Sequence, residues 1–518
     1  MQLRFQGFDD FVVFFKPNGL RMHLVDDGQF GFVEAISAKM QQPLFIVHRL
    51  DKETSGLVLF AKSKAAASML TELFEDHLVQ KTYFFLTDQT ITQKKLTVRT
   101  HIEKLQNHFV NSKSQVEPNS ETEFEYQKAS GQFHLWKATP KTGKPHQIRL
   151  HAQHAGISVC GDSEHGGCKW FRLALHASGL RFSLKGTQHN FSVALPPSFE
   201  NADVFPIMNL FQDAIFNKTE FLQFDKNSCF RLIHTEGAAV RADVFGRHLW
   251  VYDYAATGLS TLEIQKIQDF ANENELSSSV RHMVDRGTGV GGLEKSTLHS
   301  LHMPTSWNAT EATVTYELRT DSGFSPGLFL DQKENRAFVR NIAAGKSVLN
   351  LFSYTGGFSV VAAIGNAKQV TTVDVSKKFL EWSKENFKLN QILIEKNEFF
   401  AQDCLLFLKG AKKRERTWDL IICDPPSFGR SQDAVWKIEK NLPELAELMW
   451  ACLAESGQIL FTCNYEKWTR NQLLQEFVKK LPKTQFKIAR LPFLSLDFGE
   501  TDDTKNVMKG FLLQRLLT

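Results

Sequence analysis

Short apolar runs separated by turn residues follow one another through the first 195 residues. They are FVVFF (11–15), LFIV (44–47), LVLF (57–60), TYFFL (82–86), FHLW (133–136) and HQIRLHA (146–152). Runs of this length between turn residues are typical of β-strands. Only one helix is expected among them, at about 64–77, so the pattern predicts a largely antiparallel α+β domain.

The pattern of apolar and polar residues changes at about residue 347, where predicted strands alternate with predicted helices. The strands are SVLNLF (347–352), VTTVDV (370–375), FFAQDC (399–404), WDLIICD (418–424) and GQILFTC (457–463). The clearest helix is SKKFLEWSKENFKLN (376–390). This alternation predicts an α/β doubly wound, Rossmann-like sheet that binds ligands at the carboxyl ends of its strands.

A multidomain organisation follows from the length of 518 residues, which exceeds one ordinary core. The segment LPPSF (195–199) marks a break, and a helix with a connector is expected after it. Mixed strands and one helix near 262–275 separate this connector from the alternating part. The predicted boundaries are 1–205, a linker at 206–224, a small central α+β domain at 225–315, and 316–518.

Composition narrows the class of protein only moderately. The 61 Lys and Arg exceed the 57 Asp and Glu slightly, which permits a nucleic-acid partner without requiring one. Seven cysteines without a C-x-x-C spacing support neither a disulfide framework nor a zinc module, and no metal site is expected. No signal-peptide layout and no membrane-length apolar window occur, so a cytoplasmic protein with no membrane partner is predicted.

The stretch HRLDKETSGLVLF (48–60) places an acid and a cation just before a predicted buried strand. One interpretation is an exposed ion pair between Arg49 and Asp51. The other is a catalytic carboxylate, and it depends on motifs elsewhere in the first 200 residues. These motifs are KPNG (16–19), KTYFF (81–85), TGKPHQIRLH (142–151), GISVCGDSEHGG (156–167) and LALHASGLRF (173–182).

This ordered set of motifs resembles the RluA-type pseudouridine synthases over about 11–200. The resemblance implies that Asp51 is the catalytic aspartate, acting as a nucleophile or as a base in a glycal route. Arg149 would pair with Asp51 and keep it ionised, and Tyr83 would stack on the flipped base and shuttle its proton. Arg49 would fill the gap left by the extruded base. The family needs no cofactor.

The same resemblance implies RNA contacts for Lys144 and His146. Lys144 and the proline after it stand where the family has Arg and Thr, and His165 stands where it has Tyr. Lysine keeps the charge of arginine but loses its planar fork. Plainer interpretations also stay open, with Tyr83 as a core aromatic and His48 as a satisfied buried histidine.

A second constellation begins in NLFSYTGGFS (350–359), where a predicted strand ends in a turn of small residues. The backbone at Gly356 and Gly357 can approach a ligand closely, although the glycine spacing does not fit a dinucleotide site. Asp374 ends the next strand, where it can accept hydrogen bonds from ribose hydroxyls. In CDPPSF (423–428), two prolines stiffen the loop that carries Asp424.

These residues resemble the class I S-adenosylmethionine methyltransferases. The segments SPGLFLDQKENR (325–336), DPPSF and MKGFLLQRL (508–516) are similar to RlmI/RlmK-type rRNA methyltransferases, a similarity that spans about 225–518. The segment 229–247 is typical of their central, RNA-binding-type domain. The resemblance implies that S-adenosylmethionine is held by Asn350, Phe352, Ser353, Tyr354, Thr355, Gly356, Gly357, Asp374, Asp403 and Asp424. It implies RNA contacts through Gln332, Arg336, Pro425 and Phe428.

The methylated base is left open between two alternatives. Cys463 ends the fifth predicted strand, and a thiolate there could attack C6 of cytosine and activate C5 for methylation. The related 5-methylcytosine enzymes have a cysteine at this position, whereas the guanine-N7 relatives have Asn-rich sequence, which Asn464 matches. Cys463 is also compatible with a small apolar core role.

The sequence therefore predicts a bifunctional RNA-modification enzyme that forms pseudouridine and methylates a base, in ribosomal RNA by preference and in tRNA as the second choice. Both reactions need a flipped or single-stranded base. One alternative is a methyltransferase whose synthase half only binds RNA. The other is a small-molecule methyltransferase, which leaves residues 1–200 without a role.

Overall fold

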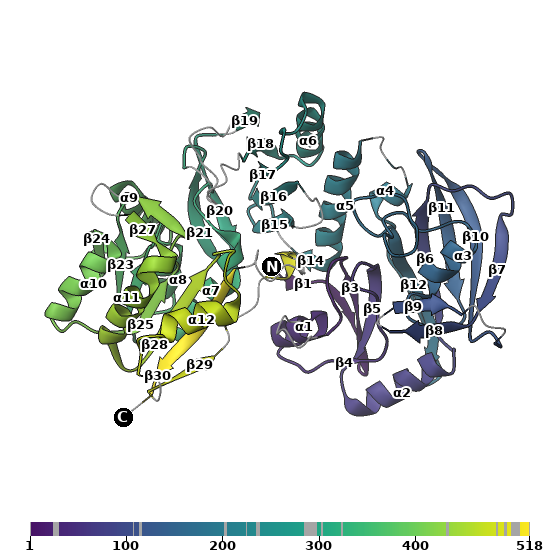
Figure 1. The fold of residues 1–518 in the computed structure, drawn as a ribbon, viewed down its shortest axis with the longest axis horizontal. Helices are drawn as coiled ribbons and strands as arrows, with labels where there is room; N and C mark the ends of the chain where they lie inside the picture. The colour runs from purple at the N-terminus through teal and green to yellow at the C-terminus, as the bar shows by residue number, and fades with distance from the viewer. Residues whose placement is uncertain are drawn as a thin grey trace. The chain divides into compact units, whose positions relative to one another are not determined.

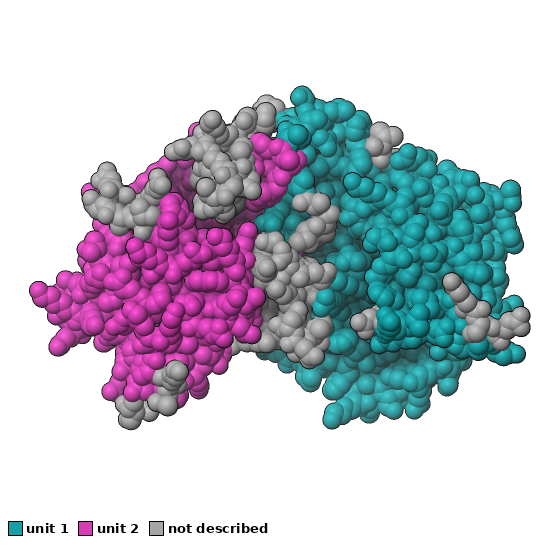
Figure 2. Space-filling model, viewed as in Figure 1, with its two compact units in different colours: residues 1–225, 232–242, 257–278 teal, residues 226–231, 243–256, 279–518 magenta. Residues whose placement is uncertain are grey.

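The computed structural model divides the chain into two compact units (Figure 2). Unit 1 comprises 1–225, 232–242 and 257–278, and unit 2 comprises 226–231, 243–256 and 279–518. The segment predicted as a central domain is divided between the units, and the predicted boundaries stay predictions. The described residues are 2–23, 31–106, 108–112, 116–200, 202, 205–223, 225–234, 239–283, 298–301, 304–322, 325–430, 435–482, 485–489, 491, 495–498 and 508–516.

Unit 1 is built on a ten-stranded, mostly antiparallel sheet (Figure 1). Its strands are β2 (Phe5–Gly7), β3 (Phe11–Lys16), β4 (Phe45–Ile46), β5 (Ser55–Ala61), β6 (Gln80–Thr87), β7 (Lys95–Thr100), β10 (Ser120–Ser130), β11 (Phe133–Pro140), β12 (Leu175–Leu184) and β13 (Thr187–Ser192). The order is β2-β3-β5-β12-β6-β11-β10-β7, with β4 beside β5 and β13 beside β12. Only β5 and β12 pair in parallel, so the predicted antiparallel α+β class is confirmed.

Two further strand pairs are short. They are β1 (Gln2–Leu3) with β14 (Leu222–Gln223), and β8 (Ile102–Leu105) with β9 (His108–Asn111). A five-stranded sheet follows in the order β15 (Cys229–Ile233), β16 (Val240–Phe245), β17 (His248–Asp253), β18 (Ser277–His282) and β19 (Leu298–Leu301). Mixed strands were predicted for this part of the chain.

More helices interrupt the strands before residue 195 than the single one predicted there, namely α1 (Phe32–Met40), α2 (Lys64–Glu75) and α3 (Gln147–His154). Unit 1 continues with α4 (Pro197–Glu200), α5 (Pro206–Phe221) and α6 (Thr261–Glu273). The predicted helix at 64–77 is confirmed as α2, where the Ser63 side chain accepts a hydrogen bond from Ala66 N. The helices expected after residue 200 and near 262–275 are α5 and α6.

The strand expected at 146–152 is wrong, because these residues begin helix α3. Ile148, Leu150 and Ala152 alternate with polar residues, which imitates the period of a strand. Ile148 and Ala152 are also one helical turn apart, and both are buried in the core that includes β6 and β11. Packing of α3 against β10 and β11 therefore decides between two patterns that the sequence permits equally (Figure 1).

Unit 2 contains the predicted doubly wound sheet. Its strands are β22 (Ser347–Leu351), β23 (Gln369–Asp374), β24 (Glu398–Ala401), β25 (Trp418–Cys423), β28 (Leu453–Cys463), β29 (Phe486–Ala489) and β30 (Lys509–Arg515). They run in the order β24-β23-β22-β25-β28-β30-β29 (Figure 1). All neighbours from β24 to β28 are parallel, and β30 is antiparallel to both β28 and β29. The class predicted from the alternation is confirmed.

Helices cover both faces of this sheet because successive strand residues point to opposite sides. Leu349 and Ile421 share one apolar core with α10 (Cys404–Lys413), α11 (Ile438–Ala451) and α12 (Arg470–Val478). Val348 and Leu420, one residue earlier, share the other with α7 (Lys333–Ile342), α8 (Gly357–Ile364) and α9 (Lys377–Leu389). This burial explains why the strands read as continuous apolar runs.

The remaining elements of unit 2 are short. They are the hairpins β20 (Ser306–Glu311) with β21 (Val314–Arg319) and β26 (Phe428–Arg430) with β27 (Val435–Lys437), and the 3-10 turns η2 (Leu330–Gln332), η3 (Ile394–Lys396) and η4 (Leu496–Phe498). Within the described residues, no helix combines the length and the apolar composition that a membrane crossing requires.

Candidate functional sites

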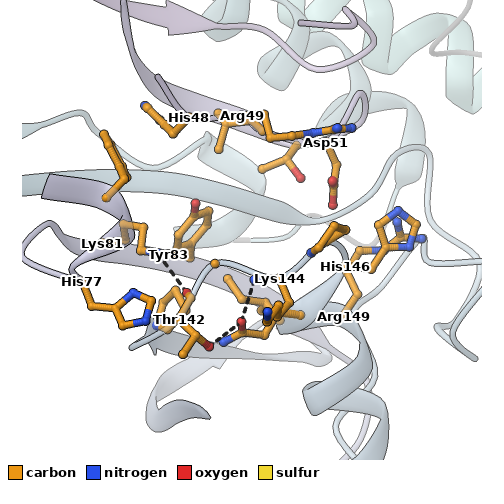
Figure 3. A pocket seen from close by; sticks show the side chains of 18 of the residues that line it. His48, Arg49, Asp51, His77, Lys81, Tyr83, Thr142, Lys144, His146 and Arg149 are labelled. Atoms are coloured by element: carbon orange, nitrogen blue, oxygen red, sulfur yellow. Dashed lines mark hydrogen bonds between the residues drawn. The ribbon is translucent and has the colours of Figure 1, made fainter. Parts of the chain in front are cut away.

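A cavity of about 510 Å³ in unit 1 brings together the residues predicted for uridine chemistry (Figure 3). This volume lies in the range of small-ligand sites. In Figure 3, His48, Arg49 and Asp51 from the segment before β5 lie along one side, and Lys81, Tyr83, Thr142, Lys144, His146 and Arg149 face them from the other. The ionisable residues that line the cavity are His48, Arg49, Asp51, Glu75, His77, Lys81, Tyr83, Lys144, His146 and Arg149.

Asp51 is partly buried, and the turn after it is fixed by the sheet. Thr54 N donates to the Asp51 carbonyl (3.1 Å), and β5 then begins at Ser55. Gly56 has φ +122°, and a Cβ there would lie 2.1 Å from the Ala177 carbonyl oxygen of β12. Only glycine permits this close approach of the two parallel strands, which explains the TSG sequence.

The Asp51 carboxylate forms no ion pair and no hydrogen bond with another described side chain. The interpretation of Arg49 and Asp51 as an exposed ion pair is therefore wrong. Asp51 contributes to the field at its neighbours, since it raises the pKa of Tyr83 in addition to the larger effect of burial. A carboxylate that faces a cavity and has no partner among the described side chains is available to a ligand.

Tyr83 and Arg149 enter the same cavity from β6 and α3. Tyr83 is partly buried beside the apolar core of the sheet, and its raised pKa means that the phenol stays protonated at neutral pH. The core interpretation and the site interpretation are thus both compatible with its position. Asp51, Tyr83 and Arg149 lie more than 30 residues apart in sequence, and the fold places them around one cavity.

The predicted pair of Arg149 with Asp51 is wrong in this structure. The Arg149 guanidinium donates instead to Asp162 through Nε (2.6 Å) and Nη2 (2.7 Å), and to Glu164 through Nη2 (2.8 Å). Burial acts to lower the pKa of Arg149, but Asp162 and Asp51 outweigh it and raise that pKa. Asp162 and Glu164 were missed as positioning residues, although they lie in the quoted motif GDSEHGG.

The motif HQIR is organised by its glutamine. Gln147 Oε1 accepts hydrogen bonds from Thr142 Oγ1 (2.7 Å) and Lys144 N (3.0 Å). Gln147 Nε2 donates to the Glu121 carbonyl (2.9 Å), which ties the loop before α3 to β10. Lys144 is left exposed at the mouth of the cavity, and His146 takes a left-handed conformation (φ +54°) that points its ring into the cavity region (Figure 3).

His48 fits the interpretation of a satisfied buried histidine. Its Nε2 accepts a hydrogen bond from Leu59 N (3.0 Å), and its ring stacks on Phe74 with centroids 4.4 Å apart. Burial, with a smaller effect of the Lys81 charge, lowers the pKa of His48 to about 3. His48 is therefore a neutral acceptor that supports β5 at Leu59.

This shift predicts a pH dependence of stability. The unfolded chain protonates His48 below about pH 6.5, whereas the folded chain does so only near pH 3. The stabilisation is complete above pH 6.5 and is lost as the pH falls toward 3, because only the unfolded state takes up the proton. Urea denaturation at a series of pH values should show about one proton less taken up on unfolding between pH 6.5 and 4 in His48→Asn than in the native chain. If the free energy of unfolding changes with pH equally in His48→Asn and in the native chain, the lowered pKa of His48 is contradicted.

The predicted cofactor loop joins β22 to α8 at the carboxyl ends of the parallel strands. Ser353 N donates to the Val373 carbonyl (3.1 Å), and Tyr354 N donates to Asp374 Oδ2 (2.9 Å). Thr355 Oγ1 donates to the Gly327 carbonyl (2.6 Å). Main-chain and side-chain bonds thus hold the loop against β23 and against the segment before η2.

Gly356 is required by a neighbouring helix. It has φ +76°, and a Cβ there would lie 1.9 Å from Ser383 Oγ of α9. Gly357 begins α8 and leaves room for a Cβ, whose nearest neighbours would be Arg336 Cδ and Leu328 Cδ1, both at 3.5 Å. Close approach of a ligand to the backbone at these two glycines stays a prediction.

Three residues of the predicted cofactor set have structural partners. Asn350 Nδ2 donates to Ser359 Oγ (2.9 Å) and anchors α8 on the sheet. Phe352 packs on Trp436, with ring centroids 5.0 Å apart. Asp403 Oδ1 accepts from Leu406 N (3.0 Å) and caps α10. These contacts position the ends of β22 and β24.

Asp374 keeps its carboxylate at the end of β23. Its two oxygens accept hydrogen bonds from Tyr354 N and from Ser376 N, both 2.9 Å long, and each oxygen retains a further lone pair. Burial raises the pKa of Asp374, and the two backbone donors oppose this effect. The arrangement can accept hydrogen bonds from ligand hydroxyl groups.

Asp424 lies in the DPPSF loop after β25 and is held from two sides. Its Oδ1 accepts from Thr462 Oγ1 (2.8 Å), and its Oδ2 accepts from Gln332 Nε2 (2.9 Å). Burial raises the pKa of Asp424 to about 6, and the two hydrogen bonds limit the rise. Gln332 also accepts from Asn335 Nδ2 (2.7 Å), so its predicted role as an RNA contact is replaced by a buried structural one.

Arg336, like Gln332, was predicted as an RNA contact and is buried instead. It is 3% exposed and donates to both carboxylate oxygens of Glu311. Burial acts to lower the pKa of Arg336, but the Glu311 carboxylate outweighs this effect and raises it. A buried bidentate pair cannot also contact a phosphate. Pro425 is buried as well, and Phe428 is partly buried at the start of β26.

Cys463 ends β28 as predicted and is 1% exposed. Its Sγ accepts a hydrogen bond from Tyr465 N (3.2 Å). Burial, and to a smaller extent Asp424, raise the pKa of Cys463 to about 12, so it is a neutral thiol in the free protein. The adjacent Asn464 is exposed. Both alternatives for the methylated base are compatible with this strand end.

The residues at these strand ends fit S-adenosylmethionine. Ser353 Oγ is buried and has no hydrogen-bond partner among the described residues. It lies between the end of β22 and the Asp374 carboxylate at the end of β23, where a ligand with several hydroxyl and amino groups can satisfy both. Ser353, the Tyr354 backbone, Asp374 and Asp424 are the groups that would hold the cofactor.

Two family models match separate parts of the chain. Residues 10–154 match the model described as RNA pseudouridylate synthase, and residues 289–510 match the model of an S-adenosylmethionine-dependent methyltransferase. The chain therefore joins a pseudouridine synthase domain to an S-adenosylmethionine-dependent methyltransferase domain. The predicted fusion of these two families, and S-adenosylmethionine as the cofactor of the second, are confirmed.

Named relatives cover part of the chain. A protein of Shewanella sp. (strain MR-4) named "Ribosomal RNA large subunit methyltransferase K/L" is 35% identical over 190 residues, which are 36% of this chain and 26% of the relative. A protein of Alteromonas mediterranea with the same name is 44% identical over 140 residues, 27% of this chain and 20% of the relative. The chain thus spans about a quarter of the length of the curated relatives it matches.

Solved structures agree with the methyltransferase fold. One, described as a candidate methyltransferase complexed with SAH, is 25% identical with a TM-score of 0.53, and covers 65% of this chain and 88% of its own. A candidate S-adenosylmethionine-dependent methyltransferase from Streptococcus mutans covers the same shares at 24% identity, with a TM-score of 0.52. The second similarity supports the fold alone.

Proposed function

We propose that this protein modifies RNA in two ways, by isomerising uridine to pseudouridine in unit 1 and by methylating a base in unit 2. The observation that carries the first activity is the unpaired Asp51 carboxylate, which faces Tyr83 and Arg149 across one cavity within a pseudouridine synthase domain. The methyltransferase domain and the names of the relatives support the second, with large-subunit ribosomal RNA as the preferred substrate and tRNA as the second choice.

The cavity has the charge that a flipped nucleotide requires. Arg49, Lys81 and Lys144 line it, and these cations can contact the phosphates around an extruded uridine. Tyr83 offers a ring for the base to stack on. Pseudouridine formation breaks the N1–C1′ bond, rotates the base and joins C5 to C1′, with a proton moving from C5 to N1 in the net reaction.

Asp51 has the position for the first step of this rearrangement. As a nucleophile it would attack C1′ and release the base, and as a base it would remove the C2′ proton in a glycal route. Arg149 acts through its ion pairs with Asp162 and Glu164, which fix a positive charge in the wall of the cavity.

In unit 2, bound S-adenosylmethionine supplies an electrophilic methyl group. Asp374 and Ser353 would orient the cofactor, and the stiff DPPSF loop would position the target base beside it. For cytosine, the Cys463 sulfur would add to C6 while the methyl group joins C5, and it would leave once the C5 proton is removed. For guanine N7, no covalent step is needed, because N7 carries a free lone pair.

The proposal is tested by mapping modified nucleosides in ribosomal RNA and tRNA from cells with and without the gene. Carbodiimide adducts score pseudouridine, and mass spectrometry of the same fragments scores methylation. Loss of one pseudouridine and one methyl group establishes both activities. Loss of a methyl group alone shows that unit 1 is only an RNA-binding platform, and no change in either mark contradicts the proposal.

A serine substitution at Cys463 separates the two candidate bases. If the product is 5-methylcytosine, Cys463→Ser is expected to lower the methylation rate at least about 10³-fold, because a hydroxyl cannot replace the thiolate nucleophile. Methyl transfer from radiolabelled cofactor to RNA measures the effect, and Cys452→Ser, in another buried cysteine of unit 2, is the matched control. A Cys463→Ser protein with normal transfer would instead favour guanine N7.

A further inference from the structure

Three potential metal ligands converge beside the cavity of unit 1. His146 Nδ1 lies 3.2 Å from His165 Nε2, and Glu164 Oε2 lies 3.6 Å from the first nitrogen and 3.8 Å from the second. His146 lies in the loop before α3, and Glu164 and His165 lie in the segment that follows Cys160. The side chains are 26%, 50% and 10% exposed for His146, Glu164 and His165, so the cluster is accessible from solvent.

These separations fit tetrahedral zinc. Bonds of about 2.0–2.1 Å from Zn²⁺ to nitrogen and oxygen place neighbouring ligand atoms about 3.3–3.4 Å apart. The three donor atoms are within about half an ångström of that arrangement before any metal binds. Two histidines, one glutamate and an open fourth position form a ligand set that zinc accepts in proteins.

The cluster is held in place by its surroundings. His165 N donates to Asp162 Oδ1 (3.1 Å), and Gly167 N donates to the Asp162 carbonyl (2.8 Å). A Cβ at Gly167 would lie 1.9 Å from the Val159 carbonyl oxygen, so this turn is closed tightly.

Arg149 is the one cation in direct contact with the cluster among the described residues, through Glu164 Oε2 (2.8 Å). Its charge opposes metal binding, and its two hydrogen bonds to Asp162 keep it in place when Glu164 engages a metal. The sequence did not predict this site because the two histidines are 19 residues apart, and because His165 stands where the synthase family has tyrosine.

We propose that His146, Glu164 and His165 bind Zn²⁺, and that the bound ion inhibits the synthase reaction. The inhibition rests on the proposed function of unit 1, whereas the binding does not. A divalent charge at His146 lies in the wall that faces Asp51, where it attracts that carboxylate and competes with the uridine sugar for it.

Calorimetric titration of the metal-free, full-length protein with ZnCl₂ tests the binding. One equivalent is expected to bind, at least about 10-fold more weakly in His165→Tyr, which restores the residue of the family. Glu164→Gln, at a half-exposed position, gives a second variant with the same expected loss. The control is Cys168→Ser, since Asp88, Cys160 and Cys168 form a second potential ligand cluster among the described residues.

Co²⁺ in place of Zn²⁺ reports the ligands directly. A tetrahedral visible spectrum without a thiolate charge-transfer band is expected, and a thiolate band that disappears in Cys168→Ser would overturn the proposal. Equal Zn²⁺ affinity of His165→Tyr, Glu164→Gln and the native chain would also overturn it.

Inhibition is measured as pseudouridine formed by the metal-free protein with and without added Zn²⁺. At saturating Zn²⁺, at least about a 10-fold loss is expected in the native chain, restored by chelator and smaller in Glu164→Gln. Binding of Zn²⁺ without any loss of pseudouridine would overturn the inhibitory role. A metal-free protein that forms no pseudouridine would contradict the proposed function and leave the calorimetric result on the site intact.

Discussion

Asp51→Asn is expected to reduce pseudouridine formation by at least about 10³-fold, because it removes the carboxylate that attacks or deprotonates the sugar. Asparagine has nearly the same volume, and the Asp51 side chain has no described partner to lose, so the fold should be unchanged. Tritium release from RNA labelled at uridine C5 measures the rate. The methylation rate of unit 2 reports that the protein is intact.

The matched control is Glu53→Gln, which neutralises an exposed acid two residues later in the same turn. It should form pseudouridine within about twofold of the native rate, because surface charges contribute little to a site that they do not line. An Asp51→Asn protein as active as this control would contradict the catalytic role of Asp51. If both variants lose the same fraction of the pseudouridine-forming rate, the negative charge of the turn matters and Asp51 has no specific catalytic role.

Arg336→Met should lower the free energy of unfolding of unit 2 by about 3–5 kcal/mol, because it leaves the Glu311 carboxylate buried without a partner. Glu311 is 6% exposed and Arg336 is 3% exposed, so water cannot replace the lost guanidinium. Urea denaturation followed by the tryptophans of unit 2 measures the change. An RNA-contact role for Arg336 predicts weaker RNA binding with normal stability instead.

Two comparisons make this prediction specific. The double variant E311L/R336M removes both charges and should regain most of the lost stability. Asp321→Asn disrupts the exposed pair of Asp321 with Lys378 (3.0 Å) and should cost less than about 1 kcal/mol. A small effect of Arg336→Met, similar to that of Asp321→Asn, would contradict a structural role for the buried pair.

The sequence determined those strands and helices whose buried residues form a local apolar pattern. The apolar runs at 347–352, 370–375 and 418–424 became neighbouring parallel strands, because strands covered on both faces require continuous apolar sequence. Where a pattern satisfied two periods at once, as at 146–152, only packing against the sheet could select the helix.

The residues of the candidate site could be predicted from residue type and motif, whereas their hydrogen-bond and ion-pair partners could not. Asp51, Tyr83 and Arg149 were identified as one set, and the structure places them around one cavity. The partner of Arg149 could not be derived, since an arginine followed by several acids in the same region can pair with any of them. The structure selects Asp162, whose carboxylate is buried and within 2.7 Å.

The sequence by itself thus determined the two families, the strand order along the chain and the residue types available for chemistry. Only the tertiary structure decided that Gln332 and Arg336 are buried and that Ser383 leaves no room for a side chain at position 356. It also decided that His146 and His165, 19 residues apart, lie in contact. The physical reason is that burial and side-chain pairing depend on distances between segments remote in sequence, and no local pattern of residues encodes those distances.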